Sequence, residues 1–127
     1  MENDSAAKIL VADDDRTALA LVERLLASRG HSVVPVVNGA QALDETRKAS
    51  FGLLVLDLHM GRPTGLEVIT ELRSSGNSVP IILMSGSFTR DHLLQAAVVA
   101  GVTCVSKPFS IPEFEAAVAN LIGKEST

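Results

Sequence analysis

Four short apolar runs in this chain each lead into polar residues of types that bind metal ions and phosphoryl groups. Residues 9–12 are followed by Asp13-Asp14-Asp15, 53–56 by Asp57, 81–84 by Ser85, and 102–105 by Ser106 and Lys107. If these runs are parallel strands of one sheet, their carboxyl ends meet at the edge where open α/β sheets bind ligands. Acids, a hydroxyl and an ammonium gathered there would form a site for a cation and a phosphoryl group.

The acids at this edge need a positive partner. Two carboxylates about 4 Å apart repel by roughly 4 kcal/mol at an effective dielectric constant of about 20. Lys107 and a bound divalent cation are the two candidates to offset this repulsion. All-oxygen ligands favour a hard ion such as Mg²⁺, or Mn²⁺ in its place. Asp15 we interpret instead as the start of a helix, where acids are favoured.

Asp57 is the candidate nucleophile of the set. A carboxylate accepts a phosphoryl group as an acyl phosphate, which is a known form of covalent catalysis. Charge on the phosphoryl oxygens then needs electrophilic partners, and Lys107 and Ser85 meet that need. A lone serine after a strand or a lone lysine before a proline is usually a loop residue, so the prediction depends on the whole set.

Strand-like and helix-like segments alternate five times and must position these residues. We expect strands at 8–12, 31–37, 52–56, 80–84 and 102–106, and helices at 17–29, 40–49, 65–74 and 90–100, with a last helix beginning at Ser110. Pro35 marks the second strand as an edge strand, and Ser110 with Glu113 predicts a capping box. Five such units predict an α/β fold, a doubly wound parallel sheet with helices on both faces.

Composition limits the classes of protein. The 127 residues fit one domain, and 46% hydrophobic with 20% charged residues is typical of a globular protein. The net charge of -4 without a Lys/Arg cluster argues against a direct nucleic-acid partner. One Cys excludes an internal disulfide, and no apolar stretch approaches the ~20 residues of a membrane span. The polar, acidic first residues are not a signal peptide, so we expect a cytoplasmic protein without a membrane partner.

The chain resembles the receiver domain of two-component response regulators over about residues 8–122, with tails at 1–7 and 123–127. The resemblance is carried by four motifs in order along the chain. They are Asp13-Asp14, Asp57-Leu58-His59-Met60 with Gly65 eight residues after Asp57, Ser85-Gly86, and Lys107-Pro108-Phe109, which starts 22 residues after Ser85. This resemblance implies the flavodoxin-like (βα)5 fold with strand order 2-1-3-4-5, and a cis bond between Lys107 and Pro108.

The resemblance also implies a function. Asp57 would take a phosphoryl group from a histidine kinase or histidine phosphotransfer protein that docks near the first helix. Mg²⁺ would be held by the side chains of Asp14 and Asp57 and the backbone carbonyl of His59, with Asp13 acting through water. Lys107 would contact the phosphoryl group, and Ser85 would move to hydrogen-bond it. The signal would pass to a protein partner on the face made by the fourth helix, fifth strand and fifth helix, so the chain would be a signalling phosphoacceptor and not an enzyme.

Three positions depart from the receiver pattern. Cys104 stands three residues before the lysine, where receivers commonly carry Tyr or Phe, and we interpret it as a small buried hydrophobe. Gly61 stands where the loop after Asp57 usually has its proline, and that proline is shifted to Pro63. We hypothesise that His59, two residues after Asp57, alters the lifetime of the acyl phosphate; the alternative is an ordinary exposed loop histidine.

The other two histidines and two of the helices bear on surfaces. We assign His31 to a strand edge and His92 to a helix surface, without function. On the fourth helix we expect Ala96 and Val99 to be exposed. The first helix carries more apolar residues than one buried stripe needs, which predicts a docking surface. They are Ala18, Leu19, Ala20, Leu21, Val22, Leu25, Leu26 and Ala27.

Three other readings compete with this function. An aspartate-nucleophile phosphohydrolase typically needs a second acid two residues after the nucleophile, where this chain has His59, and a nucleophile on the first strand. A flavodoxin-type FMN carrier needs a Ser/Thr/Gly-rich phosphate loop where this chain has three acids, and the chain has no Trp or Tyr to stack on a flavin. A non-phosphorylated protein-interaction receiver is disfavoured because every acceptor residue is present. A stand-alone regulator and an excised domain of a longer protein both remain open.

Overall fold

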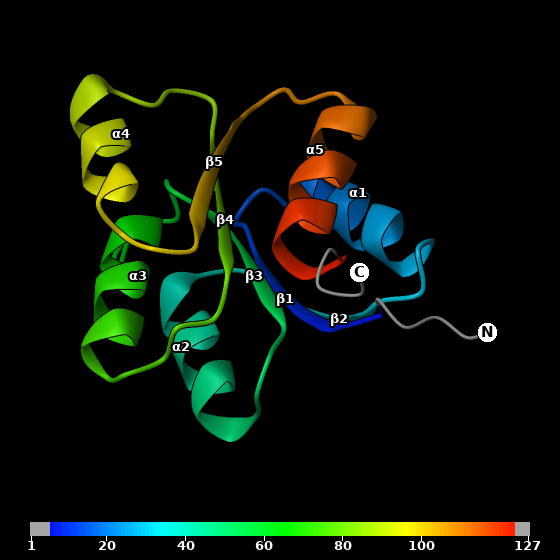
Figure 1. Cartoon of the computed structure of the whole chain (residues 1–127), viewed down its shortest axis with the longest axis horizontal. Coiled ribbons are helices and arrows are strands. Elements are labelled where there is room, and N and C mark those ends of the chain that lie inside the picture. The colour runs from blue at the N-terminus through cyan, green and yellow to red at the C-terminus, as the bar shows by residue number, and fades with distance from the viewer. Residues whose placement is uncertain (1–5, 124–127) are drawn as a thin grey trace.

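The computed structural model describes residues 6–123 and contains a five-stranded parallel sheet flanked by helices (Figure 1). The strand order is β2-β1-β3-β4-β5, as the resemblance implies. The strands are β1 Lys8–Ala12, β2 Ser32–Val36, β3 Leu53–Asp57, β4 Ile81–Ser85 and β5 Val102–Ser106. The helices are α1 Arg16–Ala27, α2 Gly39–Lys48, α3 Gly65–Ser74, α4 Arg90–Ala97 and α5 Ile111–Val118, continued by a π-helical turn, η1, at Ala119–Gly123. The predicted tails at 1–7 and 123–127 fall largely outside the described residues.

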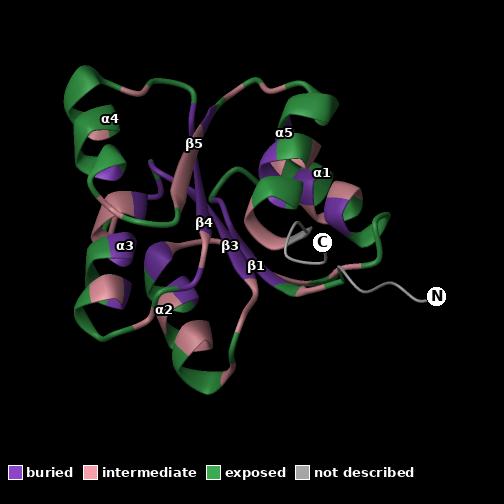
Figure 2. Ribbon diagram, in the orientation of Figure 1, coloured by how far each residue is buried: buried purple, intermediate pink, exposed green. Residues whose placement is uncertain are grey.

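The sheet separates two hydrophobic cores. Helices α1 and α5 cover one face, and α2, α3 and α4 cover the other (Figure 1). Because strand side chains alternate in direction, Ile9 and Val11 pack against α1 and α5, while Leu10 and Ala12 pack on the opposite face. The central strands are therefore buried on both faces, which is why their sequences are continuously apolar (Figure 2).

Two helices end earlier than their sequence pattern predicts. Helix α1 ends at Ala27, and the chain turns at Gly30, whose φ is 91°. Helix α4 ends at Ala97, before the turn at Gly101 with a φ of 79°. Glycine adopts these positive φ values without the steric cost that a Cβ imposes. The glycines thus mark the turns correctly, but the last helical residue lies before them.

The caps differ partly from the prediction. Of the two capping-box bonds predicted for α5, the structure shows one, from the Glu113 N–H to Ser110 Oγ at 3.1 Å. A complete capping box occurs instead at α3, where Thr64 and Glu67 each accept a bond from the other's backbone N–H. Pro35 lies on β2 at the edge of the sheet, as predicted.

The exposed apolar side chains of α1 agree with the expectation of apolar residues beyond the buried stripe, and those of α4 correct the expectation made for that helix. On α1, Leu19, Val22 and Leu26 are buried, while Leu21 is 50% exposed. Ala96 on α4 is buried and Val99, just after the helix, is half-buried, so the expectation that these two are exposed was wrong. The side of the helix that carries Leu93 and Leu94 faces solvent instead. Val98, just after the helix, is also exposed. Within residues 6–123, no helix is long and apolar enough to cross a membrane.

Gly65 lets α3 begin directly against the end of β3. A Cβ at this position would lie 2.7 Å from the Asp57 carbonyl oxygen and 2.8 Å from Leu83 Cδ1. Both contacts are shorter than van der Waals distance, and the first is to backbone, which cannot turn away. The loop after Asp57 is therefore closed tightly only when residue 65 has no side chain.

We expect Gly65→Ala to destabilise the fold by about 1–3 kcal/mol, because the added methyl group forces the α3 start away from β3. Urea denaturation followed by circular dichroism measures the change. Gly86→Ala is the matched control, since a Cβ there would have Lys107 O, at 3.9 Å, as its nearest neighbour. Equal stability of the two variants would contradict the proposed close approach.

Candidate functional site

One edge of the sheet collects the buried polar side chains of the fold. Among the described residues, the buried polar or charged ones are Asp13, Asp57 and Ser85. Asp13 directly follows β1, Asp57 ends β3 and Ser85 ends β4. Burial of polar groups costs free energy unless they are paired. Their concentration at the carboxyl ends of three adjacent strands therefore marks this edge as the candidate site.

Three carboxylates meet at this edge. Asp13, Asp14 and Asp57 each offer an oxygen, and these oxygens lie within 4.8 Å of one another. Asp13 and Asp57 are buried, whereas Asp14 is exposed. Strands β1 and β3 are hydrogen-bonded neighbours, which is what brings acids 43 or 44 positions apart in the sequence together. The predicted convergence of the acids is therefore found in the structure.

Lys107 supplies the positive charge between two of these carboxylates. Its Nζ lies 2.8 Å from Asp13 Oδ2 and 3.1 Å from Asp57 Oδ1. Lys107 follows β5, and its backbone N–H donates to the Ser85 carbonyl at 2.8 Å, which ties the β5 end to β4. The Lys107–Pro108 bond is cis, as the resemblance implies. One ammonium between three carboxylates leaves an excess of negative charge.

The pKa values of Asp57 and Lys107 reflect this excess of negative charge. Burial raises the pKa of Asp57, the hydrogen bond from Lys107 opposes that rise, and the Asp13 charge adds to it, so the net direction is upward. Burial lowers the pKa of Lys107, but its hydrogen bonds to Asp13 and Asp57 outweigh burial and leave the pKa raised. Lys107 is thus held as a cation, while the ionised Asp57 is unfavourable in the folded protein.

The three consecutive acids after β1 differ in their contacts. Asp13 Oδ1 accepts a bond from the Asp15 N–H at 2.9 Å, while its other oxygen faces Lys107. Asp15 is the N-cap of α1 and accepts bonds from the N–H groups of Thr17 and Ala18. The interpretation of Asp15 as a helix-start residue is confirmed. Asp13 and Asp14 remain at the carboxylate cluster.

Two loops border the cluster. Ser85 Oγ accepts a bond from the Ser87 N–H at 2.9 Å, so its hydroxyl is engaged with its own loop. His59, in the loop after β3, is exposed, and its Nε2 lies 3.3 Å from Ser87 Oγ. His92 of α4 contacts the His59 ring, although the sequence pattern predicts only a place on the helix surface for it. This contact between His92 and His59 can be found only from the three-dimensional structure.

Cys104 lies on β5 and is half-buried rather than fully buried. It packs against the core beneath α2, α3 and α4, and burial raises the pKa of its thiol. The interpretation as a small hydrophobe is consistent with this position, although the side chain is less enclosed than expected.

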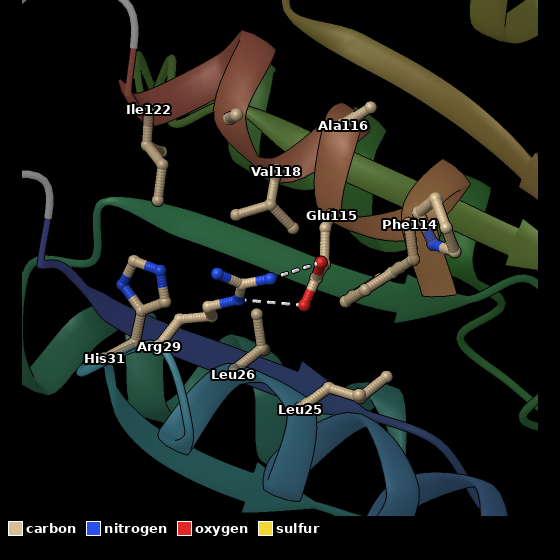
Figure 3. Close-up of a pocket in the computed structure, with 11 residues that line it drawn as sticks. Leu25, Leu26, Arg29, His31, Phe114, Glu115, Ala116, Val118 and Ile122 are labelled. Carbon is tan, nitrogen blue, oxygen red and sulfur yellow. Dashed lines mark hydrogen bonds and ion pairs between the residues drawn. The ribbon is translucent and has the colours of Figure 1, made fainter. Parts of the chain in front are cut away.

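A separate cavity of about 580 Å³ lies between the end of α1 and α5 (Figure 3). Inside it, the Arg29 guanidinium donates two bonds to the Glu115 carboxylate, at 2.9 and 2.6 Å. His31 Nδ1 accepts a bond from the Ala7 N–H, and burial lowers the pKa of this histidine. These polar groups join elements of the fold to one another, and the cavity shares no lining residue with the carboxylate cluster.

We expect Asp57→Asn to raise the stability of the metal-free protein at pH 7 by about 1 kcal/mol. The pKa of Asp57 is raised in the folded state, so its protonated form favours folding and that contribution is lost as the pH rises through the folded pKa. Urea denaturation in EDTA measures the gain, which should shrink as the pH falls into the range where Asp57 is protonated. Asp44→Asn, at an exposed acid, is the control. A loss of stability at position 57 would contradict this electrostatic account.

Comparison with known proteins agrees with the fold. The response regulator receiver domain family matches residues 9–119. The transcriptional regulatory protein PrrA of Mycobacterium leprae is 32% identical over 118 residues, which cover 93% of this chain and 51% of that protein. The response regulator MprA of Mycobacterium avium is 36% identical over 120 residues, covering 91% of this chain and 50% of that protein. The chain therefore spans about half the length of these curated relatives.

Solved structures show the same architecture. A response regulator receiver protein from Sinorhizobium medicae has a TM-score of 0.83 at 27% identity, over 94% of this chain and 96% of that one. A two-component response regulator from Clostridium difficile has a TM-score of 0.86 at 20% identity, over 94% and 98% of the two chains, and so supports the fold alone. With the family match covering most of its length, the chain belongs to the response regulator receiver domain family.

Proposed function

We propose that this chain, over residues 8–122, is the phosphoacceptor of a cytoplasmic two-component or phosphorelay system. Asp57 takes a phosphoryl group from a phosphohistidine donor, and the modified domain passes the signal to a protein partner. One observation carries the proposal: a buried carboxylate at the sheet edge, with two further carboxylates and one lysine ammonium at hand. The chain acts as a signalling phosphoacceptor and not as an enzyme with a substrate of its own.

The transfer itself is a displacement at phosphorus. A carboxylate oxygen of Asp57 forms the new O–P bond while the N–P bond of the phosphohistidine breaks, and the electron pair of that bond returns to the imidazole nitrogen. Lys107, which is held as a cation, donates to a phosphoryl oxygen. Ser85 exchanges its bond from the Ser87 N–H for one in which its own O–H donates to the phosphoryl group.

The donor set at the cluster fits a hard divalent cation. It consists of carboxylate oxygens that lie within 4.8 Å of one another, with neither imidazole nor thiolate among them. We assign Mg²⁺ to the Asp14 and Asp57 side chains and the His59 backbone carbonyl, with Asp13 acting through water. When bound, the ion supplies positive charge that offsets the carboxylate excess and the charge on the phosphoryl oxygens.

A groove next to Lys107 supports docking of the phosphoryl donor at α1. It has a volume of about 340 Å³ and lies between α1 and the segment after β5. Its lining residues are Ala18, Leu21, Val22, Met84, Lys107, Pro108 and Phe109. An apolar groove that includes Lys107 lets a histidine kinase or histidine phosphotransfer protein bury apolar side chains close to Asp57. A downstream partner on the α4–β5–α5 face is supported by the exposed Leu94, Val98 and Ile111.

Incubation with acetyl phosphate and Mg²⁺ tests the acceptor assignment. We expect the intact mass to increase by one phosphoryl group in the wild type, and Asp57→Asn to remain unmodified because it lacks the nucleophile. Lys107→Ala should slow modification by about 100-fold, since one electrophilic donor to the transferring group is lost. EDTA should prevent modification of the wild type.

Asp44→Asn is the control for Asp57→Asn, since its carboxylate is exposed on α2 and pairs with Lys48. An adduct that persists in Asp57→Asn would move the acceptor to another residue. Absence of an adduct in the wild type under saturating Mg²⁺ would overturn the proposed function.

The docking groove gives a second test. We expect Leu21→Arg to slow phosphotransfer about 10-fold or more from a phosphotransfer domain that serves the wild type, because the charge cannot be buried in an apolar contact. Modification by acetyl phosphate, which needs no docking surface, should stay at the wild-type rate. Leu94→Arg, at a leucine on α4 that is 58% exposed, is the control and should leave phosphotransfer unchanged. Equal effects of the two variants would argue against docking at α1.

A further inference from the structure

Residues of three segments form a continuous series of contacts between the candidate site and the start of α4. The series begins at Ser85, whose Oγ accepts the Ser87 N–H at 2.9 Å. Ser87 Oγ in turn lies 3.3 Å from His59 Nε2. The second of these contacts connects the loop after β4 to the loop after β3. We call Ser87, His59 and His92 the loop bridge.

The third member of the loop bridge belongs to α4. The rings of His59 and His92 meet edge to face, with centroids 5.8 Å apart and planes at 70°. This is a favourable arrangement for aromatic rings. His92 is the third residue of α4 and completes its capping box: its Nδ1 accepts the Thr89 N–H at 3.0 Å, and its own N–H donates to Thr89 Oγ1 at 3.1 Å. The ring that touches His59 is therefore fixed to the N-terminus of the helix.

Helix α4 is held to the rest of the fold by little buried surface. Ala96 is its buried residue, while Leu94 is 58% exposed and Val98, just after the helix, is 85% exposed. An element with few buried apolar contacts is shifted at low cost in free energy. A change at its N-terminus would therefore alter how its apolar residues are presented to a partner.

The residue beneath α4 offers no comparable connection. Cys104 on β5 pairs in register with Leu83 of β4 and packs against the same core as Ala96. It is a small side chain without a ring, so it cannot swing between an outer and an inner position as a large aromatic side chain could. Besides the loop that leads from β4 into α4, the hydrogen-bond and ring contacts shown between the site and α4 run through the two histidines.

We propose that the loop bridge couples phosphorylation of Asp57 to the position of α4. This inference rests on the proposed function. When the Ser85 hydroxyl turns to the phosphoryl group, the Ser87 N–H loses its acceptor and the loop after β4 rearranges. Ser87 and His59 then shift together, and the His59 ring carries the change to His92 and the helix start. His59, Ser87 and His92 are positioning residues, and the coupling exists because their contacts differ between the two states of Ser85.

The test uses the ¹⁵N-labelled full chain with acetyl phosphate and Mg²⁺. Amide chemical-shift changes of residues 93–98 are measured and normalised to the phosphorylated fraction, which intact mass gives. In the wild type we expect clear shifts in α4 as well as at Ser87. In His92→Gln the α4 shifts should fall about twofold or more while those at Ser87 persist. Gln at this position retains a capping box, so the unphosphorylated α4 spectrum should stay close to wild type.

Further variants separate coupling from a merely structural role. Ser87→Ala breaks the loop bridge on the other side of His59 and should reduce the α4 shifts to a similar extent. The double variant Ser87→Ala/His92→Gln should reduce them no further than either single change, because both act on one connection. His31→Gln, at a histidine far from the loop bridge, and Cys104→Ala should each keep the full response.

The outcomes distinguish this inference from the function on which it rests. Full α4 shifts in His92→Gln, or their loss in Cys104→Ala, would overturn the coupling while leaving the acceptor role intact. A phosphorylated wild type without shifts in α4 would do the same. A wild type that takes up no phosphoryl group would overturn both.

Discussion

The contact between the Lys107 ammonium and the carboxylates of Asp13 and Asp57 is the interaction on which the site depends. It brings together groups that follow or end three different strands, and it offsets repulsion that would amount to several kcal/mol. Its geometry requires β1 and β3 to be neighbours and β5 to end at the same edge. The parallel sheet thus brings charged side chains from several strands to one edge. The three carboxylates carry more negative charge than Lys107 offsets, which favours a bound cation.

The rest of the fold tolerates this charged edge because the strands leading to it are so strongly apolar. Residues 9–12, 53–56 and 81–84 are completely buried and bind the helices to both faces of the sheet. The folded state therefore tolerates an unfavourable ionised Asp57 because the neighbouring strands bury so much apolar surface. Destabilised groups of this kind are common at functional sites, where reactivity takes precedence over stability.

Exposed apolar residues lie on two sides of the fold. Leu21 and the groove next to Lys107 lie on the α1 side, close to the acceptor carboxylate. Leu94 and Val98 lie on the α4 side, and the loop bridge joins the start of α4 to the candidate site. Under the proposed function, such a division would let one partner deliver the phosphoryl group while another responds to its presence.

The sequence by itself determined the alternation of elements, the edge position of β2 and the residues of the site. Continuous apolar runs, Pro35 and polar residues at strand ends are local signals, and each has a direct physical meaning. The predicted ends of the helices were less accurate, because α1 and α4 end before the glycines that mark the following turns. The complete capping box at α3 went unnoticed, although Thr64 and Glu67 have the spacing of that motif.

Only the tertiary structure decided which side of α4 is buried and which residues contact one another between loops. The apolar residues of α4 allow more than one buried face, and packing against β5 selects Ala96 rather than Leu94. The contact of His59 with His92 joins segments that are far apart in sequence, so no local pattern could indicate it. Local propensity sets the type of an element, whereas side-chain contacts between elements depend on how the whole chain packs.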